Sequence, residues 1–120
     1  MNSKMKYQIK FTSIFKRRIK KLSKKYPRIK QDFSKLIDDL EQGYFHGDEI
    51  QGFQGKVYKV RLASVDQQKG KRGGFRFIYY VVTKNCIVYM MTAYAKSSQE
   101  DITNQQKQEI KDFINMLLSG

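Results

Sequence analysis

The sequence is poor in the residues that build disulfides, metal centres and acid–base pairs. Its 120 residues include one cysteine, one proline and one histidine. Cys86 has no second cysteine with which to form a disulfide or bind a metal ion, so we interpret it as a core thiol in a reducing compartment. The sequence has no apolar run of the roughly 18 to 20 residues that span a bilayer, and no apolar segment follows the basic N-terminus. These absences predict a cytoplasmic protein with no membrane partner.

Acidic residues are also scarce. The chain has 24 lysines and arginines against 11 aspartates and glutamates, which gives a net charge of +13. Such an excess attracts polyanions, so nucleic acid, the ribosome or an acidic protein is the expected partner. In residues 1–35 the only acid is Asp32, and a solvated helix surface would account for this bias as well as an RNA footprint would. The RNA interpretation assigns phosphate contacts to Arg17, Arg18, Lys20, Lys21, Lys24 and Lys25.

The composition is that of a packed domain, with 40% hydrophobic and 13% aromatic residues. We expect residues 1–120 to form one domain, because this length suits a single core. Alternation over residues 7–11 predicts a strand, and helical periodicity predicts a hairpin of two helices broken at Pro27. Strands are expected at 57–62, 75–82 and 87–94, with a short one near Ile50. A capping box at Thr103 and Gln106 then begins a helix whose apolar stripe ends at Leu118. The class is α+β.

Residues 70–76 read GKRGGFR and form the most informative loop of the sequence. Glycines allow a backbone to approach a phosphate closely, and cations supply charge-assisted hydrogen bonds. A solvated hairpin loop is the simpler alternative. The functional interpretation gives Lys71, Arg72, Gly73 and Gly74 contacts with nucleic acid.

Cations also recur on the predicted strands beside this loop. Lys59 and Arg61 share one strand face by their spacing, while Val60 and Leu62 take the other, so the two cations should project opposite the core. An exposed basic sheet face with no function would have the same pattern, and His46 lies in a turn outside the set. The functional interpretation predicts one concave basic surface formed by Lys59, Arg61, Lys71, Arg72, Arg76, Tyr94 and Lys96.

Residues 58–62, 70–80 and 93–97 together resemble the RelE/HigB toxins of type II toxin–antitoxin systems, within the RelE/ParE superfamily. The GKRGG loop is most similar to the HigB-like branch. The resemblance implies a RelE-like fold of the microbial RNase type, with an antiparallel sheet of about four strands, two N-terminal helices and a C-terminal helix. It also implies an mRNA endonuclease that acts in the ribosomal decoding site, contacts ribosomal RNA and is held inactive by a cognate antitoxin.

The implied reaction is attack of a ribose 2′-hydroxyl on the adjacent phosphorus, with no metal ion and no small-molecule cofactor. Arg76 would bind the scissile phosphate, since a guanidinium matches phosphate oxygens bidentately. A lysine could act as the base if neighbouring cations lowered its pKa, which makes Lys59, Lys71 and Lys96 candidates. Tyr94 could stack on a base, donate a proton or be purely structural. Ser97 and Thr103 replace an arginine and a tyrosine of the best-known RelE pattern, so the resemblance assigns neither acid nor base.

Three alternatives stay open. A ParE-like relative on the same fold would act on DNA gyrase, although the dense cations around Gly73 and Gly74 favour the nuclease. A noncatalytic nucleic-acid-binding protein would dock on phosphates without cleavage. A folded but inactive toxin would have lost its function through the changes that follow Lys96.

Overall fold

The computed structural model describes residues 6–67 and 73–120. Within them, one five-stranded sheet has the order β1-β5-β4-β3-β2. Its strands are β1 (Gln8–Phe11), β2 (Asp48–Glu49), β3 (Lys56–Leu62), β4 (Phe75–Val82) and β5 (Ile87–Ala95). The α+β class is confirmed, but the sheet is mixed rather than antiparallel, because β1 pairs in parallel with β5. The short strand expected near Ile50 is β2, which makes the fifth strand.

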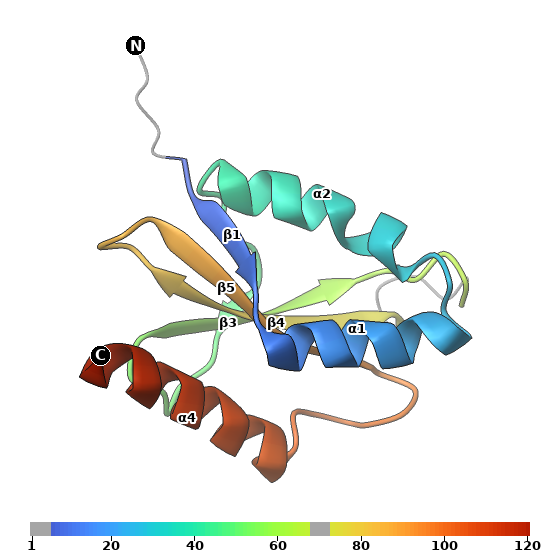
Figure 1. The fold of residues 1–120 in the computed structure, drawn as a ribbon. Helices are drawn as coiled ribbons and strands as arrows, with labels where there is room; N and C mark the ends of the chain where they lie inside the picture. Colours follow the sequence, from blue (N-terminus) through green and yellow to red (C-terminus); the bar gives the residue numbers. More distant parts are fainter. Residues whose placement is uncertain (1–5, 68–72) are drawn as a thin grey trace.

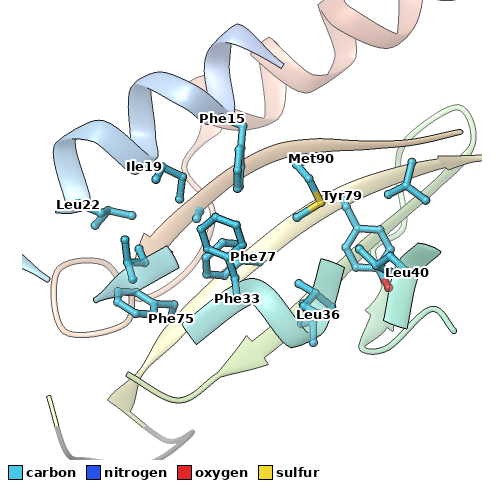
Figure 2. Packing of buried hydrophobic residues seen from close by; sticks show 14 of the residues in the cluster. Phe15, Ile19, Leu22, Phe33, Leu36, Leu40, Phe75, Phe77, Tyr79 and Met90 are labelled. Atoms are coloured by element: carbon cyan, nitrogen blue, oxygen red, sulfur yellow. The ribbon is translucent and has the colours of Figure 1, made fainter. Parts of the chain in front are cut away.

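Helices α1 (Ser13–Lys25) and α2 (Ile29–Glu41) form the predicted hairpin. Thr12 caps α1 by accepting a hydrogen bond from the Phe15 N–H, and the helix ends just before Pro27. Their apolar stripes pack on one face of the sheet, where aromatic rings from both helices meet β4 (Figure 2). Phe77, for example, lies between Phe15 and Phe33, with ring centroids 5.9 and 5.3 Å away. This cluster is the larger of two cores.

The second core lies on the opposite face of the sheet, under helix α4 (Asn104–Ser119), as Figure 1 shows. The capping box is confirmed: the Thr103 hydroxyl accepts from the Gln106 N–H, and the Gln106 side chain accepts from the Thr103 N–H. Ile110 and Ile114 are buried against the sheet. Leu118 is 61% exposed, so the apolar stripe of this helix ends earlier than predicted. No helix in the described parts of the chain is both long and apolar enough to cross a bilayer.

One edge of β5 is divided between β1 and α1. β1 pairs with its first half, and in the second half the Arg18 Nε donates to the Ala93 carbonyl at 3.1 Å. Arg18 therefore has a structural role at the sheet edge as well as a positive charge. Cys86 is not the core thiol that we expected: it is half-buried in the turn before β5, with a φ of 54°. That backbone conformation belongs to turns and not to strands.

Candidate nucleic-acid site

A row of three polar side chains crosses the sheet at one end of its α4 face. Arg61 of β3 lies directly opposite Arg76 of β4, and Arg76 lies directly opposite Tyr94 of β5. Adjacent strands are about 4.8 Å apart, so side chains in such a row are immediate neighbours. Lys59 belongs to the same face of β3, two residues from Arg61. The structure therefore brings together four of the residues that the sequence selected.

Arg61 and Arg76 form a like-charged cross-strand pair, which is destabilising unless an anion compensates for it. Arg61 is exposed, whereas Arg76 is only 6% exposed. Burial, followed by the charge of Arg61, lowers the pKa of Arg76, and Tyr94 acts in the opposite direction. The guanidinium also donates to the neighbouring Phe75 carbonyl at 3.3 Å. Burial and the charge of Arg61 both disfavour the charged form of Arg76, and groups perturbed in this way are concentrated at functional sites.

This arrangement corrects one expectation about the sheet. We expected Lys59 and Arg61 to project from a face opposite the core, but both faces carry a core in this fold. Val57 of the same strand is fully buried in the α4 cluster. The cations therefore occupy the end of a partly covered face, and Arg76 is buried there instead of projecting into solvent.

Sequence reasoning missed Asp101, which the structure places among these residues. Its Oδ1 accepts hydrogen bonds from the Lys59 ammonium at 3.1 Å, the Tyr94 hydroxyl at 3.3 Å and the Ile102 N–H at 2.8 Å. The residue lies in the loop between β5 and α4, where no spacing rule links it to β3. Only its proximity to Lys96 and Tyr94 in the sequence, at the start of a capped helix, could have drawn attention to it.

The pKa values of Asp101 and Tyr94 shift in opposite directions. The Ile102 N–H and then Lys59 hold the pKa of Asp101 below its usual range, although partial burial acts against them. Burial, followed by the charge of Asp101, raises the pKa of Tyr94 to about 12. At physiological pH the carboxylate is therefore ionised and the tyrosine keeps its proton.

Lys96 lies beyond the end of β5, in the same loop as Asp101. Its ammonium donates to the Glu100 carbonyl at 2.6 Å, and the Glu100 carboxylate is 3.7 Å away. Lys59 and Lys96 thus each contact a carboxylate. The sequence argument for a lysine base required crowding by other cations, and the described contacts of these two residues do not supply it.

The basic loop is only partly within the described residues. Lys71 and Arg72 lie outside them, so their predicted contacts have no structural account. Gly73 is half-buried. Gly74 is buried, and a Cβ at this position would collide with the Leu62 carbonyl, so close packing of the chain explains this glycine without invoking a phosphate. In the segment before the loop, Asp66 accepts hydrogen bonds from the Arg28 backbone N–H at 2.9 Å and from the Arg28 Nε at 3.0 Å. These bonds join the segment to the helical hairpin.

The cations of α1 line a groove of about 640 Å³ between that helix and the start of α4. Thr103, Gln105, Gln106 and the acidic Glu109 form the opposite wall. Lys25 is not part of this groove; its ammonium lies 5.6 Å from the centre of the Tyr26 ring. His46 is an exposed loop residue, as expected, and its Nε2 is 2.9 Å from Asp39 Oδ2. The α1 residues that line the groove are Ile14, Arg17, Arg18, Lys20, Lys21 and Lys24.

Fold and site together define a small basic α+β protein with a row of two arginines and a tyrosine at one end of its sheet. A family model described as the RelE toxin of the RelE/RelB toxin–antitoxin system matches residues 12–119. The chain belongs to the RelE toxin family.

Solved structures of low sequence identity share the fold. A mutant of the E. coli toxin RelE in the free state is 22% identical, with a TM-score of 0.53 over 80% of this chain and 90% of that chain. The RelBE2 toxin–antitoxin complex of Mycobacterium tuberculosis contains a chain that is 15% identical, with a TM-score of 0.53 over 79% of this chain and 97% of that chain. The isolated E. coli RelE toxin is 18% identical, with a TM-score of 0.51 over 89% and 98%.

Proposed function

We propose that this protein is a ribosome-dependent mRNA endonuclease of the HigB-like branch, which acts in the cytoplasm and arrests growth. The observation that carries the proposal is the row Arg61, Arg76 and Tyr94, with Lys59 beside it. An RNA phosphate bound over the two arginines would relieve their mutual repulsion. Family membership supports the same activity.

In the proposed reaction, the 2′-oxygen loses its proton and attacks the adjacent phosphorus while the bond from phosphorus to the 5′-oxygen breaks. A general base accepts the 2′-proton and a general acid protonates the leaving 5′-oxygen, so the products are a 2′,3′-cyclic phosphate and a 5′-hydroxyl. Arg76 and Arg61 stabilise the charge that develops on the phosphoryl oxygens, an effect worth about 2.7–4 kcal/mol for one well-placed donor. Tyr94 is protonated at physiological pH and its ring is buried, so the contribution we assign to it is the proton of its hydroxyl and not stacking on a base. Lys59 adds a second ammonium donor beside the row.

The α1 groove supports binding of RNA outside the reaction centre. Phosphates along a strand of ribosomal RNA would contact its cations without reading sequence, so affinity should fall steeply with salt. The groove and the arginine row are linked by the backbone of β5, since Arg18 binds Ala93, one residue before Tyr94.

A second groove supports the antitoxin partner. It measures about 590 Å³ and lies between α1 and α2, with Phe11, Phe15, Ile19, Phe33 and Ile37 in its apolar lining. Phe11 is 40% exposed there, and Lys16, Lys20 and Lys30 also line the groove. Apolar lining among cations complements an amphipathic segment with acidic flanks, as in helix-in-groove recognition. We assign this groove to a helix of the cognate antitoxin.

The decisive experiment compares messages that are translated with messages that are not. The chain is induced in bacterial cells, and new 5′ ends are mapped on an mRNA and on the same mRNA without its start codon. Wild type is compared with Arg76→Gln and with Lys35→Gln, which removes an 85% exposed cation of α2. We expect cuts in the translated message only, lost in Arg76→Gln and kept in Lys35→Gln.

Other results would point to the competing functions. Growth arrest with inhibited gyrase and no cuts would favour the ParE-like activity. RNA binding without cuts or arrest would favour a noncatalytic protein or an inactive toxin.

A further inference from the structure

Asp101 contacts two members of the proposed site from outside the sheet. Lys59 comes from β3 and Tyr94 from β5, and a single carboxylate oxygen accepts from both. The other oxygen, Oδ2, accepts no hydrogen bond within the described residues, and the side chain is 61% exposed. The carboxylate is thus fixed at one oxygen and open to solvent at the other.

The loop that carries Asp101 is held by other contacts besides the hydrogen bond from the Ile102 N–H to this carboxylate. Gln99 donates to the Asp101 carbonyl at 2.9 Å and to the Gln106 side chain at 2.9 Å. Lys96 binds the Glu100 carbonyl, and the capping box of α4 is complete without Asp101. The contacts of this side chain with Lys59 and Tyr94 are not needed to form the loop, so they indicate a use outside local folding.

We propose that Asp101 is a positioning residue, which holds the Lys59 ammonium and the Tyr94 hydroxyl as one unit beside the arginine row. Lysine has a flexible four-carbon stem, and fixing such a side chain costs rotamer freedom. The ion pair with Asp101 orders the Lys59 side chain before RNA binds. An ammonium has three N–H donors, so Lys59 keeps two of them for a phosphate while one remains on Asp101.

The contacts of Asp101 argue against a role as the general base. Three donors converge on one oxygen, which makes the carboxylate a weak proton acceptor. They instead give it a fixed geometry, which is what a residue that orients others requires. A misplacement of about 1 Å at a reacting centre can reduce a rate by about 10²-fold.

This role rests on the proposed nuclease function and predicts a slower chemical step without weaker RNA binding. Removing an anion from a cationic site should strengthen RNA binding, whereas loss of positioning should slow the chemical step. With purified ribosomes programmed with a short mRNA, we expect Asp101→Asn to lower kcat by about 10²-fold while KM stays constant or falls. Asp101→Glu, which restores the charge one methylene further out, should recover part of kcat.

The matched control is Glu100→Gln, which removes the same charge one residue away. The Glu100 side chain is 95% exposed, and Lys96 keeps its hydrogen bond to the Glu100 backbone in this variant. We expect the control to keep kcat within about twofold while KM changes as in Asp101→Asn, since both lose one negative charge. An unchanged kcat in Asp101→Asn, or an equal loss in Glu100→Gln, would overturn the positioning role.

A measurement without RNA separates this inference from the proposed function. Ammonium groups held in an ion pair exchange protons slowly enough for their ¹H–¹⁵N signals to be observed by NMR. We expect a distinct Lys59 signal that moves to the position of solvated lysines in Asp101→Asn and stays in Glu100→Gln. If wild type cleaves no RNA but Lys59 behaves in this way, the nuclease proposal fails and the contact stands. A Lys59 signal that is the same in wild type and Asp101→Asn refutes the inference.

Discussion

The two faces of β4 differ mainly at one end. Seven of its eight residues are buried. Facing α1 and α2, every side chain belongs to the larger core: Phe75, Phe77, Tyr79 and Val81. Facing α4, Ile78 and Tyr80 belong to the second core, but Arg76 introduces a buried cation at the end of the strand. One face therefore stabilises the fold, and one end of the other carries a charge where the rest of the strand has apolar packing.

The largest expected effect is on the face that stabilises the fold. Phe77 is fully buried between the rings of Phe15 and Phe33, and truncation to alanine would leave a cavity there. We expect Phe77→Ala to lower the free energy of unfolding by about 3–5 kcal/mol, a large part of the roughly 5–15 kcal/mol of a typical domain. Denaturant titration measures this. A loss below about 1 kcal/mol would mean that the core repacks freely.

Arg76, which lies next to Phe77 on the other face, should affect activity much more than stability. Arg76→Gln removes a charge that faces Arg61 directly, so relief of repulsion offsets lost packing. We expect the free energy of unfolding to change by less than about 1 kcal/mol, while the rate of cleavage falls about 10²–10³-fold. Denaturant titration and cleavage of ribosome-bound mRNA measure the two effects on one sample. Unfolding of the variant, or full activity, would remove the contrast between the faces.

Tyr94 makes a pH-dependent contribution at this same end of the sheet. Because its folded pKa is raised to about 12, the fold favours the protonated hydroxyl. The stability that this provides is complete below the usual tyrosine pKa of about 10 and is lost as the pH rises through 10 towards 12. Tyr94→Phe should therefore flatten the alkaline part of the curve of unfolding free energy against pH, measured from pH 8 to 12. Superimposable curves would show that Tyr94 ionises as freely in the folded state as in the unfolded state.

The sequence predicted single elements well and the pairing of distant elements poorly. Patterns with a local period were sufficient for α1, α2, α4 and the three long strands, because each signal lies within one element. The parallel pairing of β1 with β5 has no local signal, since residues such as Ile9 and Val88 are far apart in the chain. The position of β1 at the edge of the sheet and the partial burial of Cys86 depend on the same long-range pairing.

Prediction of the site had the same limit. Lys59, Arg61 and Arg76 could be grouped from strand alternation alone, and the register confirms that they share a face. The burial of Arg76, which is 6% exposed, has no signal in strand alternation, because alternation gives the face of a side chain and not what covers it. Asp101 could not be selected, because its role depends on a contact with Lys59 across 42 residues of sequence.

The smallest effect expected concerns the helix that covers the second face. Thr103 and Gln106 satisfy each other's backbone N–H groups at the start of α4. We expect Thr103→Ala to lower the free energy of unfolding by about 1 kcal/mol, the usual cost of losing a cap, because the Gln106 N–H loses its acceptor. Thr83, exposed in the turn after β4, supplies the matched control: Thr83→Ala should cost less than about 0.5 kcal/mol. Thermal and denaturant unfolding measure both variants. Equal losses in the two would mean that the start of α4 is held by the packing of Ile110 on the sheet and not by its cap. The second face would then tolerate fraying of the first turn of the helix that covers it.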